Sequence, residues 1–372
     1  MRTLVTLCAF VGMLAAGSKR AESPEVARAI DADGRPSTLR AARVASVGVG
    51  VVQDPDEAAL AAEVLRSARG APETLCALAA VAIEQWMGGW HGSPPSSRAV
   101  GSTAAARWAR SRRVDDRVVP VLAEGVRDTD PCVRSIAARL LGAGESEAGV
   151  EALLGALTAT AAGTREAAAL GLGLAGSRGA VDALIGALED ASAEVRMTSA
   201  WALGRVEEIR AGAALIAALD DADPRVRAEA ARSLGQLGVT DAEAALIRAL
   251  ESDADAGVRA AAAESLARLE TAGAVSALGE ALADADVEVR HIAAWGLGVL
   301  GRREAVGSLA AALARAQPEV VRETIVWALG NLHGAESADA LANVLARDDS
   351  PEVREQAAWA LAQIDARGQA SA

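Results

Sequence analysis

The stretch AEVRMTSAWALGRV at Ala193–Val206 decides the fold of this protein. Its apolar or small side chains follow the spacing i, i+4, i+7 and i+8, at Val195, Ser199, Ala202 and Leu203. This spacing predicts an amphipathic helix with one face that must be buried.

Copies of this stretch recur along the chain. Each copy opens with Val-Arg or Thr-Arg, and neighbouring arginines lie 31 or 32 residues apart. These repeat arginines are Arg134, Arg165, Arg196, Arg227, Arg259, Arg290, Arg322 and Arg354. A fixed period of this length predicts a solenoid, because one such unit is too small to bury its own apolar face. We therefore expect an array of eight helix pairs over residues 115–372.

The composition favours an all-helical protein built from small side chains. Aromatic residues make up 2% of the 372 residues, whereas alanine, the best helix former, is abundant. The 35 glycines are expected at helix ends and at close helix crossings. The formal net charge of −13 argues against a nucleic-acid partner, because binding to phosphates requires clustered Lys and Arg.

The first residues have the pattern of a targeting segment. Met1-Arg2 gives a positive end, an apolar run follows, and small residues precede Gly17. The run is shorter than the roughly 20 residues that span a bilayer, so no stable membrane span is expected. We interpret residues 1–17 as a signal peptide of a secreted or periplasmic protein. The alternative is a short helix that belongs to the fold of a cytoplasmic protein.

The region before the array is less regular. Residues 18–55 are interpreted as a linker or irregular segment, and residues 56–114 as degenerate helical repeats. In the latter, a helix is expected at Glu57–Ala68, ended by Gly70, and a second one from Pro72 to Trp86. A loop rich in Gly and Pro and a helix around Ser97–Ser111 follow. Cys76 and Cys132 fall in different candidate helices, and we expect them to be buried thiols.

Within the array, each unit shows a first helix, a capped turn and a second helix. The first helix is typified by Ala180–Glu189 and returns at Ala213–Leu219, Ala242–Leu250, Ala274–Leu282, Ala305–Leu313 and Ala338–Leu345. Asp or Ser is expected to cap the second helix, in three units before a proline at its first position. The capping residues are Asp130, Ser192, Asp223, Asp255, Asp286 and Ser350.

Glycines occupy two fixed places in the second helices. Gly176, Gly238 and Gly301 stand eleven residues after the repeat arginine, where a left-handed residue ends a helix. Another set stands eight residues after the arginine, inside the helix, where a missing side chain allows a neighbouring helix to come close. This set comprises Gly142, Gly173, Gly204, Gly235, Gly298 and Gly330.

An acidic residue accompanies the arginines. Asp stands six residues before the arginine in every unit except those with Ala159 and Ala316. We expect each Asp to accept from an arginine and to join the turns of successive units, which makes a role as metal ligand or acid–base group the less favoured interpretation. The members of this structural ladder are Asp190, Arg196, Asp221, Arg227, Asp253, Arg259, Asp284 and Arg290.

The segments VRMTSAWALG (Val195–Gly204), VRAEAARSLGQLG (Val226–Gly238) and VREQAAWALA (Val353–Ala362) resemble HEAT-like repeats of the type named after phycobilisome lyases. The resemblance covers the chain from Arg117 onward and includes the Glu57–Trp86 pair. It implies a right-handed α-solenoid of stacked antiparallel helix pairs, whose second helices line a concave face. The hallmark residues of tetratricopeptide and ankyrin repeats are absent.

Tryptophans are the best candidates for a binding surface on that face. Trp201, Trp295, Trp327 and Trp359 each stand five residues after a repeat arginine, rotated away from the core stripe. With His291, Glu323 and Glu355 they form the predicted partner-binding residues. The alternative is that each Trp only covers the alanine-rich neighbouring helix.

The sequence offers little support for an enzyme. None of the histidines His91, His291 and His333 precedes a glutamate, so the His-Glu pairs of HEAT-type di-iron hydroxylases are missing. No Cys-x-x-Cys, phosphate-binding loop or nucleophile elbow is present, and we expect no catalytic residues, metal or cofactor. The favoured function is a non-catalytic adaptor for a protein or peptide. The alternatives are a lyase-like or chaperone-like subunit acting on a tetrapyrrole-bearing protein, as the resemblance implies, and a purely structural solenoid.

Overall fold

The computed structural model describes residues 56–72, 76, 109, 114–144, 146–315, 317–332 and 334–370. All of them belong to one compact unit, Asp54–Ala372. The expectations for the signal peptide, for the linker at 18–55 and for most of residues 73–113 lie outside the described residues, as do His91 and His333. None of the described helices combines the length and apolar character needed to cross a membrane.

Every secondary-structure element in the described ranges is helical. Helix α1 (Glu57–Ala68) precedes the array and has the predicted bounds, with Gly70 beyond its end. Eight helix pairs follow within residues 119–370. They are α4 (Val119–Val126) with α5 (Pro131–Ala143), α6 (Glu147–Leu157) with α7 (Ala162–Ala175), α8 (Val181–Ala187) with α9 (Ala193–Val206), α10 (Gly212–Ala218) with α11 (Pro224–Leu237), α12 (Glu243–Ser252) with α13 (Ala256–Leu269), α14 (Ala274–Ala281) with α15 (Val287–Leu300), α16 (Val306–Leu313) with α17 (Glu319–Leu332), and α18 (Ala335–Arg347) with α19 (Pro351–Ala370).

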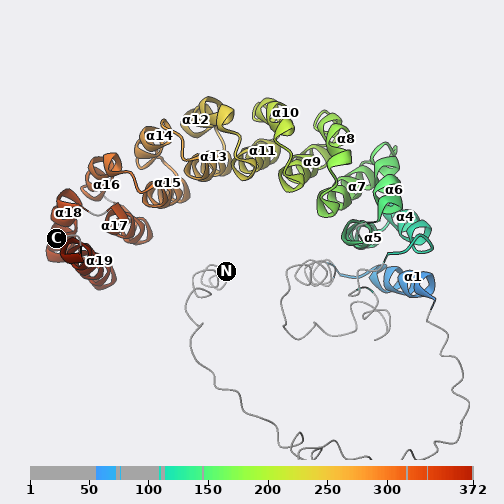
Figure 1. The fold of residues 1–372 in the computed structure, drawn as a ribbon, viewed down its shortest axis with the longest axis horizontal. Coiled ribbons are helices and arrows are strands. Elements are labelled where there is room, and N and C mark those ends of the chain that lie inside the picture. Colours follow the sequence, from blue (N-terminus) through green and yellow to red (C-terminus); the bar gives the residue numbers. More distant parts are fainter. Residues whose placement is uncertain are drawn as a thin grey trace, which may run out of the picture. The chain divides into compact units, whose positions relative to one another are not determined.

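The pairs stack in sequence order into an α-solenoid. In Figure 1 the second helices, α5 to α19, follow the inner side of an arc, and the first helices, α6 to α18, follow its outer side. Consecutive second helices pack against each other along the array. The predicted all-helical solenoid of helix pairs is confirmed. We call the surface of α5, α7, α9, α11, α13, α15, α17 and α19 that faces the inside of the arc the inner wall.

The predicted first helices are present, but four of them begin with a 3-10 turn. These turns are η3 (Arg178–Ala180), η4 (Ile209–Ala211), η5 (Thr240–Ala242) and η6 (Arg303–Ala305). The regular α-helix therefore starts one residue later than the predicted start in three of these units and one residue earlier in the fourth. The alanine that closes each turn is fully buried, which fixes the entry of the chain into the core.

The predicted caps hold the starts of the second helices, with one exception. The Asp130 carboxylate accepts from the amides of Cys132 and Val133, and Asp223, Asp255 and Asp286 act similarly. Ser350 accepts from the Val353 amide through its hydroxyl. Capping by Ser192 is wrong, because its hydroxyl donates to the Glu194 carboxylate at 2.9 Å instead.

The second helices end in left-handed residues in five consecutive units. Gly176, Gly238 and Gly301 have φ angles of 59°, 69° and 63°, as the sequence predicts. Glu207 and Glu270 stand at the same place and adopt φ angles of 57° and 52°. A side chain with Cβ is unfavourable in this conformation, so these two glutamates hold strain that glycine would not.

Second helices approach each other closely along a seam of small residues. The residue eight places after one repeat arginine faces the residue six places after the next one, and each such pair in the described array contains a glycine. A Cβ added at Gly204 would lie 2.7 Å from the Ser233 Oγ, and one at Gly235 equally close to Ser265. The predicted reason for the internal glycines is thereby confirmed. The seam pairs are Gly142 with Gly171, Gly173 with Ala202, Gly204 with Ser233, Gly235 with Ser265, Ala267 with Gly296, Gly298 with Ala328, and Gly330 with Ala360.

The repeat arginines join successive units. Arg227 donates from Nε and Nη2 to the two carboxylate oxygens of Asp253 in the next unit, at 2.7 and 2.8 Å. Its Nη1 donates to the backbone carbonyl of Asp221 in its own unit, at 2.8 Å. Asp253 also accepts from the amide of Asp255, two residues later. We call each such set a rung. The complete rungs are Arg165 with Asp190, Arg196 with Asp221, Arg227 with Asp253, Arg259 with Asp284, and Arg322 with Asp348.

The rungs are mostly buried, with arginine side chains 14–21% exposed and aspartates 8–12% exposed. Hydrogen bonds from the arginines hold the pKa values of Asp190, Asp221, Asp253 and Asp348 below the ordinary range. Arg290 lacks an Asp in the next unit and donates from Nε to the Gln317 side-chain oxygen at 2.9 Å. This substitute acceptor was not predicted, because no other unit uses a glutamine at this place.

The expectation of two buried thiols is wrong. Cys76 and Cys132 form a disulfide with a Cα–Cα separation of 5.7 Å. Their spacing of 56 residues falls across the irregular N-terminal region, where no repeat places them in space. The bond joins Cys76 to the first turn of α5, and α1 packs against α4 and α5.

We expect Arg227→Ala to lower the free energy of unfolding by roughly 1–3 kcal/mol, because it leaves the buried Asp253 carboxylate without its partner. Urea unfolding monitored by circular dichroism measures the change. The matched control is Arg225→Ala, since the ion pairs of Arg225 are exposed and screened by solvent. Equal losses for both variants would contradict the role of the rung.

Replacing Glu207 or Glu270 by glycine should raise the free energy of unfolding by about 0.5–1 kcal/mol. The gain in the left-handed backbone exceeds the entropy that glycine adds to the unfolded chain. The reciprocal variant Gly238→Ala should lose stability, although nothing surrounds the added Cβ. If both glutamate variants melted at lower temperature than the parent chain, the strain assigned to these residues would be refuted.

Acid should destabilise the array through the rungs. Because the folded pKa values of these aspartates are depressed, their stabilisation is present above the unfolded pKa of about 3.9 and is lost as the pH falls through the folded values. The urea midpoint measured between neutral pH and pH 3 should fall less steeply in Asp253→Asn than in the parent. Asp241→Asn, at an exposed acid, serves as control. Parallel curves for all three proteins would argue against this linkage.

Candidate functional site

Three tryptophans open onto one cavity of the inner wall. Trp295 on α15, Trp327 on α17 and Trp359 on α19 line a cavity of about 470 Å³. The same cavity is lined by His291, Glu323, Thr324, Gln356 and Ala360. The predicted residues Trp295, Trp327, Trp359, His291 and Glu323 therefore come together, because equal places in consecutive second helices project onto the same face.

The tryptophan side chains pack partly against neighbouring helices and are partly exposed to solvent. A Cβ at Gly298 would lie 2.5 Å from a ring carbon of Trp327, so this ring rests on the preceding helix. Even so, 36% of Trp327 and 60% of Trp359 remain exposed, and Trp295 is half-buried. Packing on the neighbouring helix thus accounts for one side of the Trp327 ring and leaves another side facing solvent.

The electrostatic character of this cavity is acidic. Among its lining residues Glu323 is the one carboxylic acid, and no Lys or Arg side chain takes part. Burial raises the pKa of Glu323 above its ordinary value, and the charges of Glu319 and Glu352 raise it further. The His291 Nδ1 lies 3.9 Å from a carboxylate oxygen of Glu288. One acid therefore lines the cavity, and acids on α15, α17 and α19 lie close to Glu323 or His291.

Two predicted residues lie elsewhere. Trp201 on α9 does not line this cavity; its ring lies against Gly173 of α7, and the Arg205 guanidinium stands 5.5 Å from the ring centroid. Glu355 is exposed on α19 but the neighbouring Gln356 lines the cavity in its place. Thr324 and Ala360 were missed, and their places two and six residues after a repeat arginine could have indicated them.

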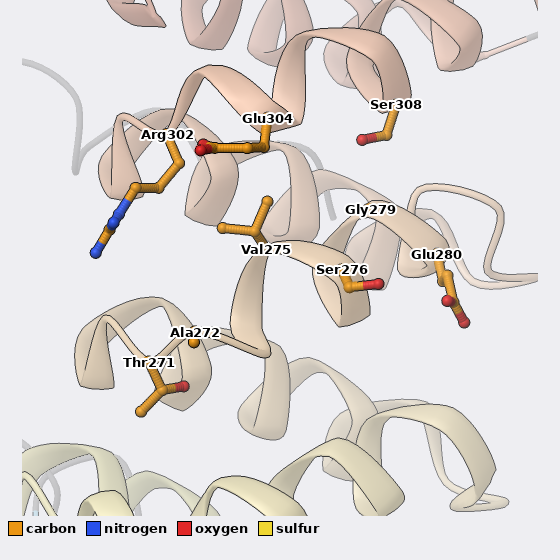
Figure 2. A pocket seen from close by; sticks show the side chains of 9 residues that line it. All are labelled: Thr271, Ala272, Val275, Ser276, Gly279, Glu280, Arg302, Glu304 and Ser308. Atoms are coloured by element: carbon orange, nitrogen blue, oxygen red, sulfur yellow. The ribbon is translucent and has the colours of Figure 1, made fainter.

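A larger cavity lies on the outer side of the array. It measures about 670 Å³ and lies between α14 with its preceding turn and α16 with η6. Figure 2 shows Thr271, Ala272 and Ser276 on one side, and Arg302, Glu304 and Ser308 on the other. Its charged side chains have both signs and no aromatic ring takes part. Nothing in it brings reactive groups together.

The described residues contain no group of three or more His, Cys, Asp or Glu side chains arranged to hold a metal ion. The carboxylate oxygens of the ladder aspartates accept hydrogen bonds from arginines and backbone amides, as those of Asp253 do. The geometry therefore offers a shaped surface, and the inner wall is the part of the array on which chemically distinctive side chains gather.

Stacked helix pairs around an inner wall define the class of α-solenoid repeat proteins. The family model for HEAT repeats matches residues 150–222, 212–286 and 275–362, together more than half of the chain, and the protein belongs to the HEAT-repeat family. No curated protein matches the chain in sequence.

Solved structures similar to this chain include very different proteins. The complex of CpcE and CpcF of phycocyanin lyase from Nostoc sp. PCC7120 is 25% identical over 67% of this chain and 94% of that chain, with a TM-score of 0.39. YibA of Escherichia coli is 20% identical over 73% of this chain and 99% of its own, with a TM-score of 0.51. Kap121p, solved bound to Pho4p, is 14% identical over 67% of this chain and 33% of its own, with a TM-score of 0.52. The last two likenesses show the fold alone.

Proposed function

We propose that this protein is a non-catalytic scaffold that binds a segment of a partner protein on the inner wall of α15, α17 and α19. The observation that carries the proposal is the cavity onto which Trp295, Trp327 and Trp359 open together. Tryptophan is enriched among the residues that dominate protein–protein binding energy, because it buries a large rigid surface at low entropic cost.

The exposure of the rings supports a binding role. Trp359 keeps 60% of its surface exposed, which is far more than a packing role on α17 requires. By contrast, the Trp201 ring has the Arg205 guanidinium 5.5 Å from its centroid. Helical or extended segments commonly bind grooves through a few spaced apolar anchors, and the three rings on consecutive helices provide such spacing.

Charge favours a partner segment that carries Lys or Arg. The chain has a formal net charge of −13, and the cavity itself holds Glu323 with Glu319 and Glu352 close enough to shift its pKa. Opposite charge on the partner would speed its approach and favour it over acidic competitors. A cationic side chain also binds well over the face of an indole ring.

The disulfide supports a location outside the cytoplasm. Disulfides such as Cys76–Cys132 persist in oxidising compartments, and the N-terminal sequence has the pattern of a signal peptide. We therefore place the proposed scaffold among secreted or periplasmic proteins, with a partner in the same compartment.

Selection from a display library of random peptides on the full chain tests the function directly. We expect enriched peptides to bind the parent chain and to bind Trp359→Ala about tenfold more weakly, because an anchor of this kind contributes more than about 1.4 kcal/mol. Binding is measured by fluorescence anisotropy of labelled peptides. Trp201→Ala, which removes a tryptophan outside the cavity, should leave affinity unchanged.

Thermal melts accompany these measurements. Trp359→Ala should melt near the parent temperature because the side chain is mostly exposed. Peptides that bind all three proteins equally, or a failure to enrich any peptide that depends on Trp359, would overturn the proposed function.

A further inference from the structure

One interface of the array lacks its rung. Arg134 on α5 faces a unit that carries Ala159 at the place where the complete rungs have aspartate. Its Nη1 still donates to the backbone carbonyls of Asp128 and Thr129, at 2.9 and 2.8 Å, which is the anchoring seen in the complete rungs. In the described part of the chain no acceptor bonds to its Nε or Nη2. We call this pair of donors the Arg134 fork.

The complete rungs show what such a fork binds. In the next interface, Arg165 donates from Nε and Nη2 to Asp190 at 2.6 and 2.8 Å. The amide of Ser192 donates to the same carboxylate at 2.8 Å. Three donors thus converge on one carboxylate, and this arrangement repeats at Asp221, Asp253, Asp284 and Asp348.

At the incomplete rung the counterparts of these three donors have no carboxylate. Ala161 occupies the place of Ser192, and its amide donates to no acceptor among the described residues. Ala161 is also the residue before α7 and gives that helix no side-chain cap. Ala161 is exposed, so a group from solvent can reach this amide.

The protein fills the other break in the series by itself. Where the unit after Arg290 lacks aspartate, the Gln317 side-chain oxygen accepts from Nε and its nitrogen donates to the Leu282 carbonyl. Among the described residues no comparable side chain accepts from Nε or Nη2 of Arg134. Glu166 lines the same cavity and its charge interacts with that of Arg134, but it makes no hydrogen bond to the guanidinium within the described structure.

The fork faces a cavity of the inner wall. Arg134 lines a space of about 270 Å³ together with Ser135, Arg139, Gly163 and Thr198 from α5, α7 and α9. A Cβ at Gly163 would lie 2.6 Å from Nη2 of Arg134, so glycine lets the guanidinium rest against the first turn of α7. The cavity shares with the tryptophan cavity the places one, two and five residues after a repeat arginine, several units earlier, whereas Arg134 and Gly163 stand at places that the tryptophan cavity does not use.

We infer that the Arg134 fork, with the Ala161 amide, is a binding site for a carboxylate group supplied from outside the chain. The planar guanidinium matches a carboxylate through two parallel hydrogen bonds, as it does in five complete rungs. The carboxylate that fits is an aspartate or glutamate side chain of a protein segment on the inner wall. That source of the group rests on the proposed function, whereas the site itself does not.

Nuclear magnetic resonance of the full, nitrogen-15-labelled chain tests the site. Sodium acetate is titrated against sodium chloride at matched ionic strength, and the signals of the Ala161 amide and the Arg134 Nε–H are followed. We expect saturable shifts with acetate alone. Equal, non-saturating shifts with both salts would overturn the site, and saturation at a lower concentration of inorganic phosphate than of acetate would overturn its assignment to carboxylate.

Two variants make the test specific. Ala159→Asp supplies the missing carboxylate internally, so it should melt at a higher temperature than the parent and lose the acetate response. Arg134→Lys keeps the charge but lacks the fork, and it should lose saturation as well. An unchanged acetate response in Ala159→Asp would overturn the inference.

The outcome is separable from that of the peptide selection. Trp359→Ala should keep the full acetate response, because Trp359 lies outside the cavity that Arg134 lines. If acetate saturates the site while no peptide depends on Trp359, the carboxylate site stands and the scaffold proposal falls. The reverse result removes the site alone.

Discussion

Close approach of consecutive second helices is the constraint on which the rest of this structure depends. Each contact along the seam contains a glycine, and its partner across the seam is alanine, serine or another glycine. Larger side chains at these places would push the helices apart, at a cost that overpacked cores typically show. Backbone groups are then near enough to bond, and the hydroxyls of Ser233 and Ser265 donate to carbonyls of the preceding helix. The abundance of alanine and glycine is a consequence of this geometry.

The rungs fix the relative position of neighbouring units, which the contact between small side chains alone leaves free to shift. Small residues alone would allow helices to slide, whereas a bidentate Arg–Asp pair with a third donor from the backbone fixes the relative position of two turns. The rung also satisfies carbonyls between the first and second helices of the same unit, as Arg227 does for Asp221. Mostly buried charge is tolerated here because every carboxylate oxygen in a rung has a donor.

How much could be predicted depended on whether a feature repeats. The helix pairs, the left-handed glycines, the internal glycines and the pairing of arginine with aspartate all recur at a fixed period, so the sequence displays each of them several times. Features that occur once escaped prediction for the same reason. The Cys76–Cys132 disulfide, the Gln317 acceptor and the use of the Ser192 hydroxyl each depend on a local arrangement in space that no neighbouring unit duplicates. The tryptophan cavity could be predicted in part. The period places Trp295, Trp327 and Trp359 on one wall, but it does not reveal how deeply each ring is covered.

The repeat separates residues that build the array from residues free to vary. The arginine, the aspartate before it and the small residues six and eight places later are occupied by structural contacts. The place five residues after the arginine faces the inner wall and holds Arg139, Leu170, Trp201, Arg232, Glu264, Trp295, Trp327 and Trp359 in turn. The side chain at this place is therefore arginine on α5 and tryptophan on α15, α17 and α19, where Glu323 adds an acid to the same cavity, with Arg232 and Glu264 between them. A segment lying along the whole wall would be held in one direction only, with its acidic side chains toward Arg134 and its basic or apolar ones toward Trp359, because the reverse direction would bring like charges together.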